Sequence, residues 1–370
     1  MILFLSAGLL AVLLAYFSQF KGQRGLLVLS LIIIVIIMGL QDAIGNDFSG
    51  YEDAFKEINT GRLTPGFFSS EKGDQYLTIE FGWFYLNRFC AFIINDFHLV
   101  SVLVALLLCI AIYKVLIYVP SNYHWLAILL FYFSISHMIL MMSALRQAFA
   151  VACFAMIVVY SFKKKIVMAL LFVILGSSFH NSFIVSILFM LILFIPYNWF
   201  QRYKKIICLV LLISFAFISM YQGKLQENLI EQALPAMSED ADRYSYYVEN
   251  IAETSVSTLA SIFTFFVFSL TLFGLYRSCN KSEMVILLYA VLSYVALAFV
   301  GNNSGSFPRM FYYMTFFNIF ASCITANHLR NPIIKAGFIV ALFLTTGYSF
   351  ITALTNIQYI RYLDYHTIFF

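Results

Sequence analysis

The chain has 370 residues and a formal net charge of +4, with 62% hydrophobic and only 11% charged residues. Water-soluble domains carry about 25% charged residues, so this composition excludes an ordinary soluble domain and indicates a multi-pass membrane protein. The apolar runs are too long for the strands of a β-barrel, and no segment is basic and aromatic enough to predict binding to nucleic acid.

In chain order, about twelve apolar segments are candidates to cross the hydrocarbon of a bilayer as helices. They cover residues 2–20, 25–40, 98–119, 124–142, 143–162, 166–179, 182–200, 206–221, 255–276, 284–300, 309–327 and 333–353. Polar stretches at residues 41–97 and 222–254 interrupt this series. The pattern predicts an all-α fold, with a single integral membrane domain over residues 1–370 and two long loops outside the bilayer.

The short turns between these segments are basic, and positive charge near helix ends marks the cytoplasmic side of a membrane protein. The basic residues of four such turns are Lys163–Lys165, Arg202, Lys204, Lys205, Arg277, Lys281, Arg330 and Lys335. The two long polar stretches instead hold most of the acidic residues. We therefore expect both stretches on the external face.

Residues 76–95 are apolar enough to be a further span, but counting them would place the basic turns on opposite sides of the membrane. This segment also carries Glu80 and Arg88 and has an amphipathic pattern. We therefore predict an interfacial helix over residues 76–95 on the external surface, with both chain termini also outside.

Three ionisable side chains lie at the external ends of predicted spans. Arg146 opens one span about 25 Å above the lysine turn, and His180 ends the next about 22 Å above the same turn, at 1.5 Å per residue. Arg309 follows Pro308 at the start of a later span from the same side. Taken singly, an arginine at a helix end is more often an interfacial anchor. Three ionisable residues on one face favour a polar site that opens outward.

Two arginines and a histidine at such a site suit a lipid diphosphate. Arginine binds diphosphate in bidentate fashion and keeps its charge at any relevant pH. Sugar transfer from such a lipid requires stabilisation of the departing diphosphate and deprotonation of an acceptor hydroxyl, which a histidine or carboxylate can perform. The cysteines show no metal-ligand spacing, and residues 238–243 indicate a solvated acidic loop, so we expect no metal and no cofactor.

Five short motifs resemble those of the EpsG-like membrane proteins, which belong with the Wzy-type O-antigen and exopolysaccharide polymerases. In the family's notation, the motifs are G-T-D-Y-x-x-Y, E-P-G-F…L-N-K, R-Q-x-I-A, F-H-x-S and a late helix rich in arginine and tyrosine. Their counterparts here are Gly45-Asn46-Asp47-Phe48 with Tyr51, Ile79-Glu80-Phe81-Gly82-Trp83-Phe84 with Leu86-Asn87-Arg88, Arg146-Gln147-Ala148-Phe149-Ala150, Phe179-His180-Asn181-Ser182, and Phe307-Pro308-Arg309 with Tyr312 and Tyr313. The chain departs from the family at Gln41-Asp42, which stand where an Arg-Tyr pair is usual.

The resemblance implies a multi-pass enzyme of the bacterial inner membrane with a GT-C-like architecture. Such an enzyme moves a growing glycan from undecaprenyl diphosphate onto the next lipid-linked repeat unit, at the outer face and without a metal. Its partners would be the undecaprenyl-diphosphate-linked oligosaccharide and membrane lipid, with a chain-length regulator left open.

Candidate roles follow from the chemistry and the resemblance together. Arg146 and Arg309 would bind the diphosphates. His180 would position the acceptor or act as the base, with Asp47 or Glu80 as the competing base. The other substrate-binding residues would be Tyr51, Gln147 and Tyr313.

Other membrane functions use similar groups. A flippase for the same lipid-linked sugar often shows two similar halves or paired broken helices, and no internal repeat is evident here. An O-antigen ligase uses a related donor and stays open as an alternative. A membrane O-acetyltransferase is less favoured, because only His180 suits its chemistry.

Overall fold

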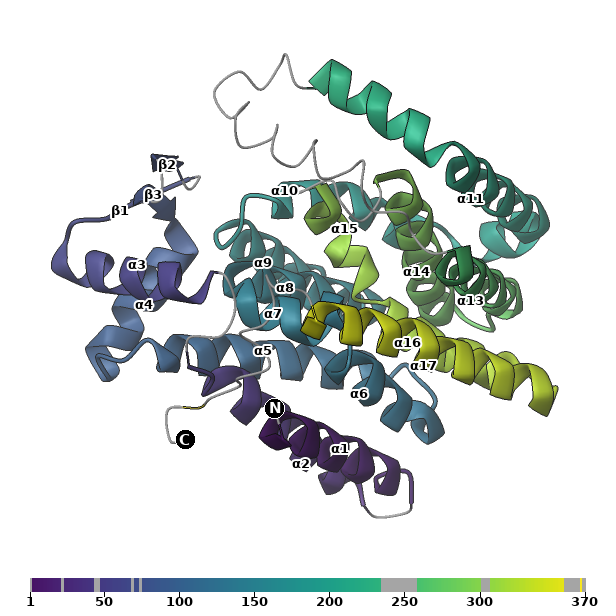
Figure 1. The fold of residues 1–370 in the computed structure, drawn as a ribbon, viewed down its shortest axis with the longest axis horizontal. Coiled ribbons are helices and arrows are strands. Elements are labelled where there is room, and N and C mark those ends of the chain that lie inside the picture. The colour runs from purple at the N-terminus through teal and green to yellow at the C-terminus, as the bar shows by residue number, and fades with distance from the viewer. Residues whose placement is uncertain are drawn as a thin grey trace. The chain divides into compact units, whose positions relative to one another are not determined.

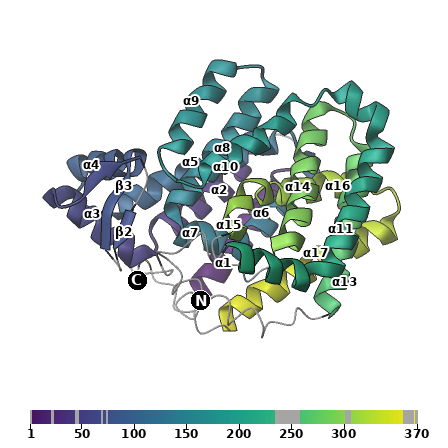
Figure 2. The same cartoon turned by 90° about the horizontal axis from the view of Figure 1, so that it is seen from above.

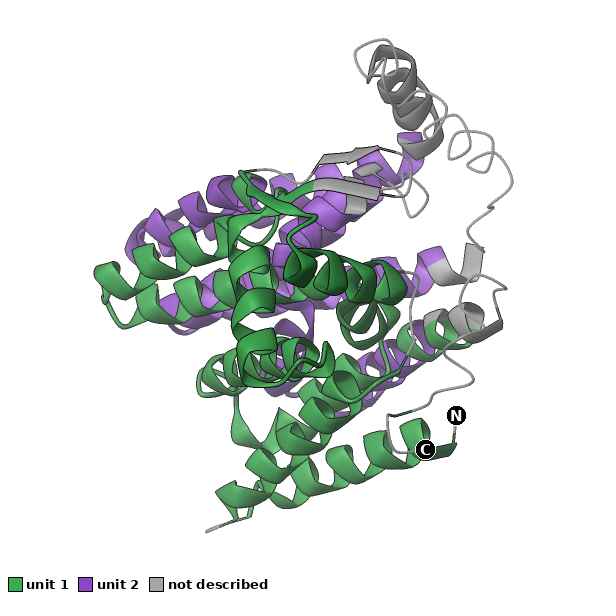
Figure 3. Cartoon of the chain, turned by 90° about the vertical axis from the view of Figure 1, so that its left-hand side faces the viewer, with its two compact units in different colours: residues 1–184, 346–370 green, residues 185–345 purple. Residues whose placement is uncertain are grey.

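The computed structural model describes residues 2–20, 23–42, 47–67, 70–72, 75–233, 258–300 and 307–355, together with Thr367. The described chain is mostly helical and forms two compact units (Figure 3). Unit 1 comprises Met1–Ile184 and Thr346–Phe370, and unit 2 comprises Val185–Thr345. The single membrane domain over residues 1–370 stays a prediction.

Unit 1 is built around one buried helix, α8. Every residue of α8 from Leu145 to Val159 is buried, and the helix packs against α5 and α9. Its alanines at 148, 150, 152 and 155 allow neighbouring helices to approach closely, as is typical of helix packing in membranes. The helices of unit 1 are α1 (Ile2–Phe17), α2 (Arg24–Gly39), α3 (Phe48–Thr60), α4 (Phe81–Ile93), α5 (His98–Leu116), α6 (His124–Tyr132), α7 (Leu140–Ser143), α8 (Leu145–Phe162) and α9 (Ile166–Ser177).

The first polar stretch contains a small sheet, so the fold is not purely helical. Strand β3 (Gln75–Glu80) pairs in parallel with β1 (Thr64–Gly66) and antiparallel with β2 (Ser70–Lys72). The prediction of a helix over residues 76–95 is therefore wrong for its first five residues, and α4 begins only at Phe81. The run Tyr-Leu-Thr-Ile before Glu80 has high strand propensity, which the helical pattern overlooked.

The same stretch also holds an amphipathic helix, α3. Its residues Phe48, Tyr51, Phe55 and Ile58 are spaced three or four apart and are buried, which places them on one face. Helix α3 packs against α4. It ends at Gly61, which adopts the left-handed conformation. Helices α3 and α4 lie together with the sheet (Figure 1).

The predicted span over residues 124–142 is broken rather than continuous. Helix α6 ends at Tyr132, a π-helical turn covers Ile135–Ile139, and α7 follows after a bend of 65°. Polar side chains explain the break, because the hydroxyl of Ser134 lies 2.8 Å from Nδ1 of His137 and competes with regular backbone pairing.

Unit 2 is arranged around α14, which packs against α11, α13, α15 and α16. Its helices are α10 (Phe183–Phe189, which begins in unit 1), a 3-10 turn (Met190–Phe194), α11 (Tyr197–Ala233), α13 (Thr258–Arg277), α14 (Lys281–Val300), α15 (Phe307–Thr315), α16 (Asn318–His328) and α17 (Pro332–Thr355, which ends in unit 1). The predicted span 309–327 is divided between α15 and α16, and 182–200 is interrupted before α11 (Figure 2). The acidic loop predicted at residues 238–243 lies outside the described residues.

Several described helices are able to cross a membrane. Four are long and apolar enough by themselves, and the bent α6–α7 pair makes a fifth. Six shorter apolar helices of 10–17 residues accompany them. The chain is therefore a helical membrane protein, whereas the twelve spans and the GT-C-like arrangement stay predictions.

Candidate functional site

The centre of the candidate site is a buried ion pair between two of the predicted residues. Glu80 is the last residue of β3, and Arg146 is the second residue of α8. Arg146 Nη1 donates to Glu80 Oε2 at 2.7 Å, and the two side chains are only 10% and 2% exposed. Because burying either charge alone costs several kcal/mol, each residue depends on the other. Strand β3 therefore delivers the partner that holds the Arg146 guanidinium in place.

Aromatic rings enclose this ion pair on one side. The guanidinium carbon of Arg146 lies 5.4 Å from the centroid of the Tyr51 ring, which is cation–π distance. Tyr51 in turn contacts Trp83, with ring centroids 5.2 Å apart. Both rings are buried, so residues of α3 and α4 cover this side of the Arg146 guanidinium.

The turn after α9 reaches the same cluster through Gly82. The Gly82 N–H donates to the Ser178 carbonyl at 2.7 Å. The ring of the next residue, Phe179, stacks on Phe149 of α8 with centroids 3.6 Å apart. These two contacts fix the segment that leads into His180 against both α4 and α8.

Alanine at position 82 is expected to disturb this junction, because its Cβ would overlap Ser178 Oγ and the Phe179 ring. Overpacking of this kind costs about 1–3 kcal/mol. Gly82→Ala should therefore lower the thermal unfolding temperature of the purified protein. Gly50→Ala is the matched control, since Gly50 lies on a helix of the same polar stretch and nothing lies within 4 Å of its added Cβ. Equal unfolding temperatures for the two variants would contradict this close packing.

His180 is held by the serine two residues later. The backbone N–H of Ser182 donates to His180 Nδ1 at 3.1 Å, and Ser182 Oγ lies 2.8 Å from the same nitrogen. A backbone N–H can only donate, so Nδ1 is an acceptor and a neutral His180 carries its proton on Nε2. The arrangement explains the serine of the His-x-Ser motif and places the proton of the half-buried neutral ring on Nε2.

Asp47 is the third candidate for the general base, and its contacts differ from those of Glu80 and His180. It precedes α3 and is half-buried, and its carboxylate forms no hydrogen bond or ion pair with a described residue. Its backbone carbonyl accepts the Tyr51 N–H at 3.0 Å. Residues four apart share one helix face, so Asp47 lies on the side of α3 that carries Tyr51.

Two buried glutamines support the start of α8. Gln147 follows Arg146 and is 1% exposed. Gln41, which was not among the predicted site residues, is fully buried and donates through Nε2 to the Met142 carbonyl at 2.8 Å. That carbonyl lies where α7 gives way to α8, so Gln41 stabilises the irregular backbone just before Arg146. Its position directly after a long apolar run was the only sequence signal for this role.

Arg309 and Tyr313 belong to unit 2. Both lie on α15, where Arg309 is exposed and Tyr313 is fully buried. Their participation in the site stays a prediction, whereas Asp47, Tyr51, Glu80, Arg146, Gln147 and His180 all belong to unit 1.

Comparison with known proteins identifies the family. A model of the EpsG family matches residues 25–367. No curated protein and no solved structure matches the chain. The match includes every motif described above, from Asp47 to Tyr313. Because it covers nearly the whole chain, the protein belongs to the EpsG family, and its function is of the polysaccharide-polymerase, glycosyltransferase-like type.

Proposed function

We propose that this protein extends a polysaccharide by transferring the growing glycan from undecaprenyl diphosphate to the next lipid-linked repeat unit. The reaction takes place at the outer face of the bacterial inner membrane, as in O-antigen and exopolysaccharide synthesis. The observation that carries the proposal is the buried Arg146–Glu80 pair, packed beside Tyr51 and beside the turn that bears His180. Four motifs that are far apart in the sequence meet in this one cluster.

Arg146 provides the positive charge for the diphosphate of the donor. Its geometry is fixed before substrate binds, because Glu80 accepts a hydrogen bond from Nη1 and Tyr51 packs on the guanidinium. A preorganised donor stabilises developing charge without reorganisation during the reaction. Glu80 is thus proposed as a positioning residue rather than the base, and Arg309 as the second ligand of the diphosphates.

His180 donates a hydrogen bond from Nε2 to a phosphate oxygen or to the acceptor sugar. This role agrees with an Nδ1 that already accepts from Ser182. A general base would need Nε2 without its proton, which in a neutral ring requires the proton on Nδ1 and the loss of that bond. The arrangement therefore favours positioning of substrate by His180.

Asp47 is then the base that the local contacts favour, because its carboxylate is not engaged by a described residue. In the proposed step, the acceptor hydroxyl oxygen attacks C1 of the donor sugar and forms the new glycosidic bond. The bond from C1 to the phosphate oxygen breaks, and its electron pair leaves with undecaprenyl diphosphate. The hydroxyl proton passes to Asp47, while Arg146 and Arg309 stabilise the leaving diphosphate without a metal.

Replacement of Asp47 by asparagine tests this assignment in a host that lacks its own copy of the gene. Asp47→Asn should reduce polymer by about 100-fold or more, the usual effect of removing a general base. Single lipid-linked repeat units should accumulate on the outer leaflet. Asp53→Asn is the matched control, since Asp53 is an exposed acid on α3 that pairs, among the described residues, with Lys56 at 3.7 Å.

The leaflet on which repeat units accumulate distinguishes the two main functional classes. Accumulation on the inner leaflet after loss of the gene would overturn the polymerase in favour of a flippase. Normal polymer from Asp47→Asn, with outer-leaflet units still accumulating on gene loss, would exclude Asp47 as the base and retain the polymerase.

A further inference from the structure

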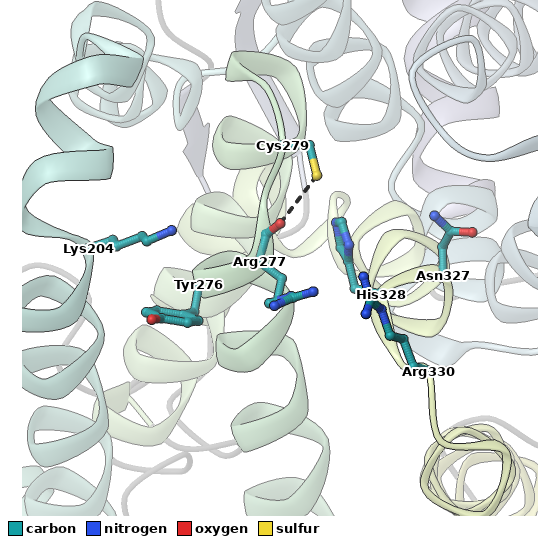
Figure 4. Close-up of a pocket in the computed structure, with 7 residues that line it drawn as sticks. All are labelled: Lys204, Tyr276, Arg277, Cys279, Asn327, His328 and Arg330. Carbon is teal, nitrogen blue, oxygen red and sulfur yellow. Dashed lines mark hydrogen bonds between the residues drawn. The ribbon is translucent and has the colours of Figure 1, made fainter.

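A second polar site lies within unit 2, at the end where its basic turns gather. A pocket of about 420 Å³ is lined by Lys204, Tyr276, Arg277, Cys279, Asn327, His328 and Arg330 (Figure 4). These residues come from α11, from the end of α13 and the turn after it, and from the end of α16 and the turn after it. Three of the seven are permanent cations, and no carboxylate lines the pocket.

The two arginines of this pocket have no anionic partner in the part of the chain that the structure describes. Neither Arg277 nor Arg330 forms a side-chain hydrogen bond or an ion pair with a described residue, and both are exposed. In Figure 4 their side chains point toward each other beside His328. Each arginine by itself is explained by a helix C-terminus or by the cytoplasmic side of a membrane protein. Neither explanation accounts for two guanidinium groups that line the same pocket without an ion-pair partner among the described residues.

The acidic residue nearest to the pocket is already engaged. Glu283 Oε2 accepts the backbone N–H of Cys279 at 2.9 Å and lies 3.1 Å from His328 Nε2. These bonds tie the α13–α14 turn to the end of α16. Neither bond involves Arg277 or Arg330, so neither guanidinium has a direct carboxylate contact among the described residues.

Hydrogen bonds also hold the side of the pocket that Lys204 and Tyr276 form. Lys204 Nζ lies 4.8 Å from the centroid of the Tyr276 ring and donates to Gln201 Oε1 at 2.9 Å. Gln201 and Tyr197 both donate to the Ser278 carbonyl, at 3.2 and 2.9 Å. Side chains of α11 therefore hold the backbone of the turn after α13, next to the cations that line the pocket.

We propose that this pocket binds a phosphate-bearing anion on the cytoplasmic side of the membrane. Arginines bind phosphate oxygens in bidentate fashion, and basic pockets between membrane helices take anionic lipid headgroups. The shared ligand chemistry is a phosphate group with net negative charge, carried by an anionic phospholipid or by a soluble phosphate. The basic turns that line this pocket are predicted to be cytoplasmic, and the test of the proposal does not depend on polymer formation.

A divalent cation is the competing occupant, because ligand atoms of Cys279, Glu283 and His328 lie within 4.8 Å of one another. Two features disfavour it. The carboxylate and the imidazole already contact each other, and the flanking arginines repel positive charge. The experiment therefore includes zinc as a separate arm.

Thermal unfolding of the full chain, in a detergent without phosphate, tests the proposal with three probes. The probes are inorganic phosphate, short-chain phosphatidylglycerol with the net-neutral phosphatidylcholine as reference, and Zn²⁺. Phosphate or phosphatidylglycerol should stabilise the protein saturably. The affinity should fall about tenfold or more in Arg277→Gln/Arg330→Gln, since each lost charged hydrogen bond weakens binding substantially. Which of the two anions stabilises the protein identifies the source of the phosphate.

The matched control removes two charges from the same end of unit 2 but outside the pocket. Lys205→Gln/Lys281→Gln should keep the affinity within about twofold, because these exposed lysines do not line the hollow. Equal losses in both double variants, or no saturable stabilisation by either anion, would overturn the proposal. Stabilisation by Zn²⁺ alone that disappears in Cys279→Ser would overturn it in favour of a metal. Size-exclusion profiles matching wild type confirm that the variants are folded.

Discussion

Replacement of Arg146 by alanine is expected to abolish polymer and to destabilise the protein at the same time. The first effect follows from loss of the proposed diphosphate ligand. The second follows because Glu80, 2% exposed, would stay buried without its partner, which costs about 3–5 kcal/mol. The checks are the length distribution of polysaccharide from complemented cells and the thermal unfolding of purified protein.

A double variant separates the two effects. Glu80→Gln/Arg146→Gln removes both charges and keeps two side chains that can bond each other, so it should recover most of the stability lost in Arg146→Ala. It should still make no polymer, because the cation for the diphosphate is absent. Polymer at wild-type levels from the double variant would show that the pair serves only the fold.

Two further substitutions sharpen this result. Arg146→Lys keeps the charge but loses the bidentate geometry, so polymer should fall strongly while the protein stays in the membrane. Arg88→Ala is the matched control, since Arg88 is an exposed arginine of α4 with one 3.3 Å bond to the Ile58 carbonyl. Its polymer should match wild type.

His180→Ala is expected to have the second largest effect on activity. It removes the N–H proposed to bind phosphate or acceptor, and loss of one preorganised hydrogen-bond donor lowers rates by about 10²–10³. The fold should change little, because His180 is only half-buried and lies on a turn rather than inside a buried helix. Polymer formation in complemented cells measures the loss of activity, and the unfolding temperature of the purified protein measures the effect on the fold.

Ser182→Ala tests whether Ser182 positions His180. It removes the 2.8 Å hydroxyl contact but retains the 3.1 Å bond from the backbone N–H. Polymer should therefore fall about tenfold, the value of one hydrogen bond, and less than in His180→Ala. His98→Ala is the control, because His98 lies at the same predicted external side and bonds only Asp96 through its ring. Full activity of His180→Ala would remove the histidine from the mechanism.

Much of the candidate site was predictable because its residues break the apolar pattern. Arg146 and His180 are rare ionisable groups next to long apolar runs, and Glu80 lies in a short motif of its own. What the sequence could not predict was the direct pairing of Arg146 with Glu80 across 66 positions. That contact depends on β3, and a six-residue strand beside an amphipathic helix looks helical when only periodicity is considered.

The elements of the membrane region show a similar division. Long apolar runs predicted α5, α8 and α14 within a few residues, because burial of the backbone requires helices there. The break at Ser134 and the split between α15 and α16 were missed, since hydropathy averages over single polar residues. Gln41 was missed for a related reason, because only the break after α7 makes its amide necessary.

The length of α11 has a consequence for how far the protein extends beyond the bilayer. The apolar part of this helix ends at Tyr221, yet the helix continues to Ala233, twelve residues farther (233 − 221). At 1.5 Å per residue the added turns are about 18 Å long, which exceeds the thickness of one headgroup layer. In the predicted orientation, α11 therefore rises past the lipid surface into the aqueous compartment. On that side of the membrane, the last turns of the helix would stand clear of the lipid headgroups.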